Sequence, residues 1–314
     1  MLSFVVPVYN EAEGIKLFHD SLLLPAVKKS CGDEYEIIYV NDGSRDDSLK
    51  IIQNIAAKNK RVRVVGLSRN FGKEIAVTAG ISVAGGDATM ILDADGQHPP
   101  ERIGDFIAAW KKGAKVVVGV RETNQKEGIV KKLGSKIFYK MFNNLSGTTI
   151  VPRSTDYRLI DKIVREEFLK CSERQRITRG IIDWLGFKRE YIYFDSPARL
   201  AGEASYSFRG LFKLAVNSFV SLTLKPLRML AWIGVFITLI SLVAGIAIFI
   251  EQFIMGDPLQ LQFTGSALLG IFITFLVGLI LISEGLLAVY LSHIYEQAQG
   301  RPMFIIDSSE SKNL

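Results

Sequence analysis

The sequence predicts an α/β domain with a mixed, mostly parallel sheet, followed by amphipathic helices and two transmembrane helices. Three observations lead to this fold class. Short β-rich runs alternate with stretches of helical spacing over about the first 120 residues. A basic amphipathic stretch comes later, and two long segments that are almost free of charge follow it. Alternating strands and helices are typical of parallel sheets, and about 20 apolar residues suffice for a helix to cross a bilayer.

Five strands are expected in the first 120 residues, each an apolar, β-rich run bounded by polar or glycine residues. They cover residues 2–8, 35–40, 62–67, 88–92 and 115–120. A further strand is expected at 191–194, where tyrosine, isoleucine and phenylalanine follow one another. This is a nucleotide-binding type of architecture, which does not by itself fix a function.

The helices between these strands are predicted mainly from their first turns. Residues 13–29 form the first helix, and oxygens in 44–47 cap a second that ends near residue 58. The segment 68–74 opens a third helix that ends near residue 84, and Glu101 begins a fourth after two prolines. Asp156 is expected at the start of a later helix, because the helix dipole favours an acid there.

Three of the strands are followed by acidic residues: Glu11, Asp42, and the pair Asp93 and Asp95. The carboxyl ends of parallel strands share one edge of the sheet, where open α/β proteins bind ligands. Side chains at i and i+2 of an extended segment point the same way, so Asp93 and Asp95 can face one site. With the amide oxygen of Gln97 they form an oxygen set that suits Mg²⁺ or Mn²⁺ bound with a substrate phosphate. The alternative is a solvated turn, since Asp-x-Asp alone is a weak signal.

Charge and composition narrow the function classes. The chain has 314 residues, a net charge of +6 and a mean hydropathy of +0.23, with the apolar excess after about residue 228. A basic chain can bind nucleic acid, an anionic membrane surface or phosphorylated substrates. No nucleic-acid partner is expected, because two membrane segments do not fit one. G-x-G-x-x-G and P-loop patterns are missing, which argues against dehydrogenases and P-loop NTPases.

Basic residues gather after the fifth strand. Between residues 121 and 140 there are six of them against two acids: Arg121, Lys126, Lys131, Lys132, Lys136 and Lys140. They predict a patch for phosphate or anionic lipid headgroups, each charge contributing ~1 kcal/mol near such a surface; a solvated helix face is the alternative. Arg121 is the best placed, because arginine binds phosphate oxygens through two parallel hydrogen bonds.

The last third of the sequence predicts membrane attachment. Residues 229–250 carry no charge, and 266–291 carry only Glu284, which should face protein rather than lipid. The connection 251–265 has two acids and no basic residue, whereas lysine and arginine flank the two segments on their other sides. The positive-inside rule therefore predicts an integral, multi-pass protein of the cytoplasmic membrane with both termini in the cytoplasm.

The expected domains follow from these segments: a catalytic domain at 1–205, interfacial helices at 206–228, a two-helix hairpin at 229–292 and a cytoplasmic tail at 293–314. Glycines at 270, 278 and 285 let helices approach closely, so a homo-oligomer is expected.

Five short motifs occur in a fixed order. They are PVYNE at 7–11, NDGS at 41–44, RNFGKE at 69–74, DADGQHPPE at 93–101 and DYRL at 156–159. In this order they resemble the family 2 glycosyltransferases, which have the GT-A fold. With the two C-terminal segments, the chain resembles polyprenyl-phosphate glycosyltransferases, namely bactoprenol glucosyltransferases and, more distantly, dolichyl-phosphate mannose synthases.

The resemblance implies roles for particular residues. Four would line the nucleotide base and ribose: Pro7, Tyr9, Glu11 and Asp42. The metal, Mg²⁺ or Mn²⁺, and the donor diphosphate would be held by Asp93, Asp95 and Gln97. Asp93 would thereby also bind the donor nucleotide, and Asp95 would also be a catalytic residue. The lipid phosphate and the closing loop would involve Arg121, Lys131, Lys132, Arg199 and Ser205. Asp156 stands at the position near the reacting centre that is often described as the base.

The implied reaction is inverting transfer of a hexose, glucose from UDP-glucose as the first expectation, onto undecaprenyl or another polyprenyl phosphate. A phosphate monoester has a second pKa of ~6, so it needs no strong base at neutral pH. Asp156 is therefore expected to orient groups and set the local charge. The alternatives are another donor (UDP-N-acetylglucosamine, UDP-galactose or GDP-mannose), a glycan acceptor, or an inactive membrane-anchored nucleotide-binding scaffold. The sequence departs from the family pattern at Asn41, Gly96 and Ser205.

Overall fold

The computed structural model describes residues 1–122, 153–174, 176–195, 197, 236, 243, 250 and 265–314. The chain divides into two compact units. The first comprises Met1–Gly210 with Arg301–Leu314, and the second comprises Leu211–Gly300.

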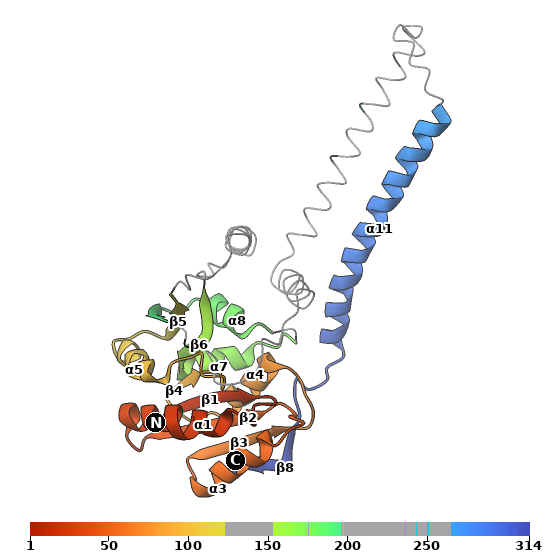
Figure 1. The fold of residues 1–314 in the computed structure, drawn as a ribbon. Helices are drawn as coiled ribbons and strands as arrows, with labels where there is room; N and C mark the ends of the chain where they lie inside the picture. Colours follow the sequence, from red (N-terminus) through yellow and green to blue (C-terminus); the bar gives the residue numbers. More distant parts are fainter. Residues whose placement is uncertain are drawn as a thin grey trace. The chain divides into compact units, whose positions relative to one another are not determined.

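The described part of the first unit is built on one eight-stranded mixed sheet (Figure 1). Its strands are β1 (Leu2–Val8), β2 (Tyr35–Asn41), β3 (Val62–Leu67), β4 (Ala88–Ile91), β5 (Val116–Arg121), β6 (Ser154–Asp161), β7 (Arg189–Phe194) and β8 (Ile306–Lys312). Their spatial order is β7-β5-β6-β4-β1-β2-β3-β8. β6 runs antiparallel to β4 and β5, and β8 runs antiparallel to β3. The other pairs are parallel, so the predicted mixed, mostly parallel sheet is confirmed.

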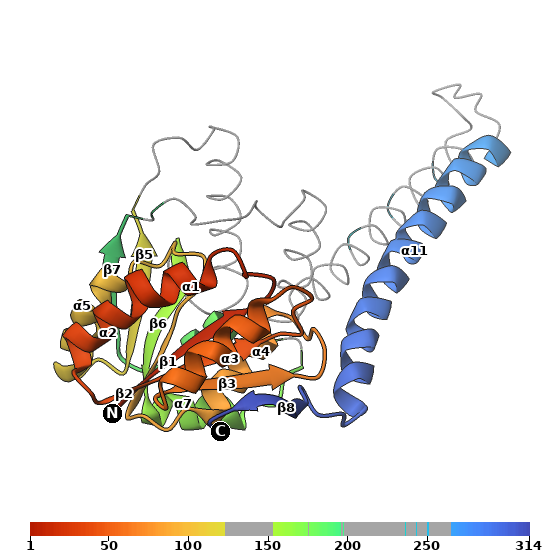
Figure 2. The same cartoon turned by 60° about the horizontal axis from the view of Figure 1, so that its bottom comes forward.

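Helices cover both faces of this sheet (Figure 2). Those of the first unit are α1 (Ile15–Leu17), η1 (Phe18–Leu23), α2 (Leu24–Cys31), α3 (Ser48–Lys58), α4 (Lys73–Val83), η2 (Pro100–Arg102), α5 (Ile103–Lys111), α7 (Lys162–Lys170) and α8 (Thr178–Trp184). Alternate residues of β1 point to opposite faces: Phe4 and Val6 join a core with Ile52 of α3, while Val5 joins one with Ala76 of α4. The first predicted helix is interrupted by the π-helical turn η1.

The helix predicted to start at Asp156 was wrong, because Asp156 lies on strand β6. β6 fills the space between β4 and β5, pairing Met90 with Leu159 and Val117 with the same leucine. A helix does begin nearby, but its acidic cap is Asp161, whose carboxylate accepts a hydrogen bond from the amide of Ile163. Non-local strand pairing therefore overrides the local helix signal, which belongs to α7.

The C-terminal residues return to the sheet, which the expected tail at 293–314 did not predict. β8 completes the sheet beside β3. The Ser311 hydroxyl accepts from the Gly66 amide at 3.1 Å, and the Asn313 amide donates to the carbonyls of Ala56 and Val62 at 3.0 and 2.8 Å. These bonds close an edge that would otherwise expose unpaired backbone groups.

The second unit contains α11 (Gly265–Ala298), a helix of 34 residues that includes the apolar segment 266–291. Several of its described apolar side chains are exposed, among them Leu269, Ile280 and Leu291. No helix among the described residues is both long and apolar enough to span a membrane. Of the segment 229–250, only Phe236, Val243 and Ile250 are described, and the interfacial segment 206–228 lies outside the described residues. The two membrane spans therefore stay predictions.

Candidate active site

The turns that follow β1, β2 and β4 lie at one edge of the sheet, as the sequence predicts, because these strands are parallel neighbours. Hydrogen bonds join the first two turns. The amide of Asn10 donates to the Ser44 hydroxyl at 3.1 Å, and the amide of Glu11 donates to the Ser48 hydroxyl at 2.8 Å. Tyr9 stays 43% exposed beside them. This edge therefore has a fixed backbone and an available aromatic surface.

Asp42 fixes the loop that leads into α4. Its two carboxylate oxygens accept hydrogen bonds from the amides of Phe71 and Gly72 at 2.7 and 2.9 Å. Gly43 has φ +65°, and a Cβ there would lie 2.5 Å from the amide nitrogen of Asn70, so the loop packs directly on this turn. Burial raises the pKa of Asp42, and the two amides oppose that rise. The buried Asp42 thus positions the first residue of α4, which is Lys73.

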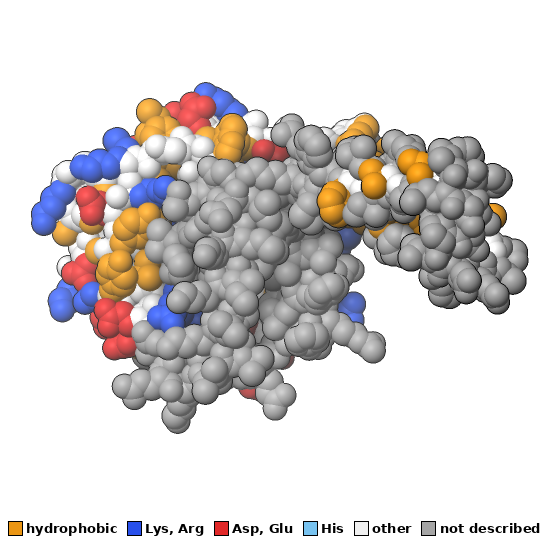
Figure 3. Space-filling view, turned by 90° about the horizontal axis from the view of Figure 1, so that it is seen from above, with side chains coloured by type: hydrophobic (Ala, Val, Ile, Leu, Met, Phe, Trp, Pro, Cys, Tyr) orange, Lys and Arg blue, Asp and Glu red, His pale blue; other side chains and the backbone are white. Residues whose placement is uncertain are grey.

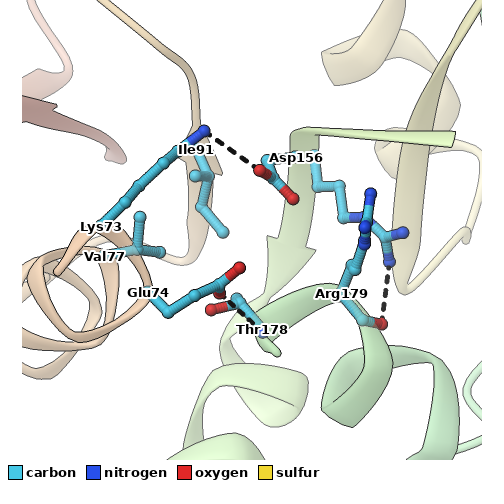
Figure 4. A pocket seen from close by; sticks show the side chains of 8 residues that line it. Lys73, Glu74, Val77, Ile91, Asp156, Thr178 and Arg179 are labelled. Atoms are coloured by element: carbon cyan, nitrogen blue, oxygen red, sulfur yellow. Dashed lines mark hydrogen bonds and ion pairs between the residues drawn. The ribbon is translucent and has the colours of Figure 1, made fainter. Parts of the chain in front are cut away.

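Lys73 reaches two carboxylates from different parts of the sheet, and Figure 4 shows its contact with Asp156. Its ammonium nitrogen lies 2.6 Å from Oδ1 of Asp93, after β4, and 3.1 Å from Oδ2 of Asp156, on β6. Burial opposes the charge of Lys73, but the carboxylates of Asp93 and Asp156 outweigh this effect and raise the pKa of Lys73. Likewise, Lys73 and then Arg179 outweigh burial and lower the pKa of Asp156. Both groups are therefore charged at neutral pH.

The conformation of the loop 93–99 is stabilised by the buried side chain of His98. The amide of Asp93 donates to Nδ1 of His98 at 3.0 Å, so that nitrogen carries no proton. The imidazole is buried and stacks on the Tyr157 ring, with centroids 5.0 Å apart. Burial lowers the pKa of His98, which keeps the ring neutral. Within the loop, Asp95 accepts from the amide of Gln97 at 3.0 Å. His98 is thus a positioning residue, a role that the sequence did not predict.

Arg121, at the end of β5, approaches the same loop. Its Nη2 lies 3.3 Å from the amide oxygen of Gln97. Its Nε is buried and has no hydrogen-bond partner within the described part of the chain. A buried N–H of this kind is costly unless it meets an acceptor. Arg121 also lines a cleft together with Asp93 and Asp95, so its guanidinium is a candidate donor to an oxyanion there.

Lys73, Arg121 and the acidic residues near them line one cleft of about 430 Å³. Its lining consists of Lys73, Asp93, Asp95, Gln97, His98, Arg121, Glu122, Arg153, Ser154, Thr155, Asp156 and Arg179. The structure therefore brings together five of the predicted site residues: Asp93, Asp95, Gln97, Arg121 and Asp156.

Other predicted residues are not part of this cleft lining. Pro7, Tyr9, Glu11 and Asp42 lie at the ends of β1 and β2, farther along the same edge of the sheet. Lys131, Lys132, Arg199 and Ser205 lie outside the described residues.

A second group of side chains surrounds a small space beside Asp156 (Figure 4). The Glu74 carboxylate accepts from the amide of Thr178 at 2.8 Å, which joins α4 to α8. Arg158, buried on β6, pairs with Asp183 of α8 at 2.8 Å. The space between these groups is only about 10 Å³, which is room for one water molecule. The chemistry therefore belongs to the larger cleft.

The donor set in the cleft suits a hard divalent cation, since it consists of the carboxylates of Asp93 and Asp95 and the amide oxygen of Gln97. Among the described residues, no three His, Cys, Asp or Glu side chains are grouped closely enough to hold a metal by themselves. A cation here would thus share protein oxygens with those of a substrate, as Mg²⁺ does at phosphates.

On the described surface seen in Figure 3, acidic and basic side chains are interspersed. The net positive charge is therefore not gathered into one patch on that visible part. The cleft lining is likewise mixed in sign.

Comparison with known proteins identifies the family. Residues 3–169 match the model of Glycosyl transferase family 2. An uncharacterized glycosyltransferase from Synechocystis sp. is 35% identical over 305 residues, which are 97% of this chain and 94% of the relative. The bactoprenol glucosyl transferase of Shigella phage SfII is 34% identical over 312 residues, 99% of each chain.

The fold has solved counterparts. Glucosyl-3-phosphoglycerate synthase from Mycobacterium tuberculosis superimposes with a TM-score of 0.51 at 18% identity, over 71% of this chain and 78% of that one. The predicted GT-A type of α/β sheet is therefore confirmed. Since the family model covers more than half of the sequence and the relatives cover nearly all of it, the chain belongs to glycosyl transferase family 2.

Proposed function

We propose that this enzyme transfers a hexose, in the first instance glucose from UDP-glucose, to a polyprenyl phosphate with inversion at the sugar. The main support is the single cleft that Asp93, Asp95, Asp156 and Arg121 line together. The acceptor is supported by several relatives that are named bactoprenol glucosyl transferase and match 98–99% of this chain. Glucose is supported by the same names.

We assign the donor side of the cleft to Asp93, Asp95 and Gln97. The M. tuberculosis synthase was crystallised with Mn²⁺ and UDP, and the oxygen-rich set of this chain suits Mg²⁺ or Mn²⁺. A bound ion would neutralise the charge that develops on the departing nucleoside diphosphate. Asp93 and Asp95 would hold that ion. The hydrogen bonds within the loop 93–99 would keep the spacing of the two carboxylates constant.

The acceptor side belongs to Arg121 and Asp156. In the transfer, a phosphate oxygen forms a bond to the anomeric carbon of the sugar while the bond from that carbon to the diphosphate oxygen breaks. The phosphate monoester is largely ionised at neutral pH, with a second pKa of ~6, so no proton has to be removed first. The guanidinium of Arg121, which lines the cleft, can donate to a phosphate oxygen. Asp156, kept ionised by Lys73 and Arg179, sets the charge and orientation of these basic groups.

A polyprenyl phosphate places the reaction at a membrane. We propose that residues 206–228 lie in the interface, that 229–250 and 266–291 span the bilayer, and that the catalytic domain and both termini are cytoplasmic. The support is the sequence, since 229–250 carries no charge and 266–291 carries one. A homo-oligomer is part of the same proposal and rests on the glycines of the second segment.

The test is UDP release by the purified full-length protein in detergent with UDP-glucose and Mn²⁺ or Mg²⁺. We expect fast release only when undecaprenyl phosphate and the divalent ion are both present. Asp95→Ala should abolish it, whereas Asp105→Ala should not. Asp105 is a matched control, because its carboxylate lies on α5 in a half-exposed pair with Arg102 at 3.2 Å, and such pairs contribute little.

The other outcomes of this test separate the alternatives. Release with UDP-N-acetylglucosamine, UDP-galactose or GDP-mannose instead of UDP-glucose would change the sugar and keep the acceptor. Release that does not depend on the lipid would point to another acceptor. No release with any donor would favour an inactive nucleotide-binding scaffold.

A further inference from the structure

Lys73 places a positive charge against the residues to which we assign the metal. Its ammonium nitrogen lies 2.6 Å from Asp93 and 3.1 Å from Asp156, so it bridges two carboxylates in a cation-like position. Figure 4 shows the side chain extended from the first turn of α4 toward Asp156. Whatever cation binds Asp93 next must share this carboxylate with the lysine or displace it.

The base of this side chain is fixed by the loop before it, whereas its charged end borders the cleft. The amides of the two preceding residues, Phe71 and Gly72, donate hydrogen bonds to the Asp42 carboxylate. The Lys73 side chain itself is 42% exposed and borders the open cleft. Lysine has a flexible four-carbon stem with a compact charge at its end. The ammonium group can therefore exchange partners without movement of the helix.

The charge balance of the cleft shows when such an exchange is favourable. Among the described residues, its lining contains four acidic residues, Asp93, Asp95, Glu122 and Asp156, and four basic ones, Lys73, Arg121, Arg153 and Arg179. The charges of this described lining thus already balance. A divalent ion alone would add two uncompensated positive charges close to an ammonium group, which Coulomb repulsion disfavours. A nucleotide diphosphate brings compensating negative charge and a new set of oxygens for the lysine.

We propose that Lys73 is an internal counter-ion that holds Asp93 and Asp156 until a divalent ion and a nucleotide diphosphate arrive together. The proposal rests on the assignment of the metal to Asp93 and Asp95 under the proposed function. Lys73 thereby weakens metal binding in the absence of donor and makes tight metal binding depend on the diphosphate. It is a positioning residue that couples the two ligands.

Lys115 offers a matched control within the same domain. Its ammonium nitrogen lies 3.0 Å from Oδ2 of Asp161, and its side chain is 44% exposed, close to the value for Lys73. Asp161 also accepts from the indole of Trp110 at 2.8 Å and caps α7. Neither Lys115 nor Asp161 lines the cleft. The two ion pairs therefore match in type and exposure and differ in location.

The experiment is a Mn²⁺ titration of the purified full-length protein, followed by the electron paramagnetic resonance signal of free Mn²⁺, with and without UDP. We expect Lys73→Gln to bind Mn²⁺ about tenfold more tightly than wild type when UDP is absent, because one nearby charge is removed. The same variant should lose most of the effect of UDP on Mn²⁺ affinity. Lys73→Arg, which keeps the charge, and Lys115→Gln should behave as wild type.

The outcomes separate this inference from the proposed function. If wild type binds Mn²⁺ in the presence of UDP but Lys73→Gln binds it no more tightly without UDP, the counter-ion role is overturned and the metal site stands. If neither protein binds Mn²⁺ even with UDP, the metal assignment of the proposed function fails and the inference fails with it. Thermal unfolding checks that each variant is folded, and Lys73→Met replaces Lys73→Gln if that variant is not.

Discussion

Two charged clusters lie at opposite ends of the same parallel strands, and they are built differently. At the amino ends, the Glu36 carboxylate accepts from the Ser3 hydroxyl and the Gly85 amide at 2.6 Å each, and from Arg63 at 2.8 Å. Glu36 is buried, and its long partner Arg63 is itself held by a hydrogen bond to the carbonyl of Val83. At the carboxyl ends, Asp93 is held by one long, partly exposed lysine that borders a cleft of about 430 Å³.

The difference shows which buried charges can take part in chemistry. The carboxylate at the amino ends has its hydrogen-bonding capacity used by the protein itself, so any exchange would leave donors unsatisfied. The cluster at the carboxyl ends can exchange one cation for another, because Lys73 is partly exposed, has a flexible stem and borders the cleft. A charged group in a fold of this kind is therefore a structural element where it is closed and a candidate ligand where it is open.

Asp156→Asn should give the largest effect, and the effect should be on activity. We expect hexosyl transfer to fall by about 100-fold or more, since a charge that orders the reacting groups is lost. Binding of the nucleotide sugar should survive, because Asp156 is not in the donor set. Initial rates of UDP release, with a UDP-glucose titration beside them, measure both. Unchanged turnover would exclude an essential role for Asp156, and Asp105→Asn is the control.

Asp183→Asn should give the largest effect on stability. Arg158 and Asp183 are 1% and 4% exposed and pair at 2.8 Å, so the change leaves a buried guanidinium without its counter-charge. We expect a loss of about 3–5 kcal/mol in the free energy of unfolding. Denaturant unfolding followed by tryptophan fluorescence measures it. Glu167→Gln, which opens an exposed pair with Lys170, should cost less than about 1 kcal/mol. Equal losses in the two variants would contradict the distinction between closed and open pairs.

Glu36→Gln should destabilise the fold by about 1–3 kcal/mol, because it disturbs a saturated buried cluster. Burial works against the Glu36 charge, but the hydrogen bonds from Ser3, Arg63 and Gly85 outweigh it and hold the pKa below its usual value. A lowered folded-state pKa means that the contribution is complete above the unfolded-state pKa of about 4.3. It is lost as the pH falls through the folded-state value.

The corresponding measurement compares the unfolding free energies of wild type and Glu36→Gln from neutral to acidic pH. The gap should be constant near neutrality and should shrink at acidic pH. A gap that grows as the pH falls would contradict the sign of this pKa shift.

Asn313→Ala should destabilise the fold only modestly, by about 1 kcal/mol of unfolding free energy. The side chain of Asn313 joins β8 to the carbonyls of Ala56 and Val62, which are neutral and closed contacts at the edge of the sheet. Catalytic rates should stay at the wild-type level well below the melting temperature. A fall in rate without a fall in stability would show that β8 acts on the cleft.

Much of the fold could be predicted from local sequence, because β1 to β5 and the helices between them follow apolar periodicity. The edge of the sheet that carries the site could be predicted as well, since the acids after β1, β2 and β4 come directly after their strands. β6 and β8 could not, because their partners lie far away in the sequence. Met90 pairs with Leu159, and Gly66 pairs with Asp307.

The same reason limited the prediction of the site. Asp93, Asp95, Gln97 and Asp156 were identified from motifs and Arg121 from the basic segment after the fifth strand, and the structure brings all five into one cleft. The roles of Lys73 and His98 depend on β6, which sets Asp156 beside Asp93 and Tyr157 over the imidazole. A lysine at the start of a helix gives no local signal of such a role. Its place in the RNFGKE motif is the one sequence feature that indicates a functional residue.

Mass spectrometry of the lipid product tests most directly whether this protein glycosylates a polyprenyl phosphate. Wild-type protein would be incubated with undecaprenyl phosphate, Mn²⁺ and UDP-glucose, in parallel with Asp95→Ala and Asp105→Ala. We predict a polyprenyl phosphate that carries one hexose with wild type and Asp105→Ala, and none with Asp95→Ala. The same product formed by Asp95→Ala at the wild-type rate, or no glycosylated lipid from wild type with any nucleotide sugar, would contradict the assignment of this cleft.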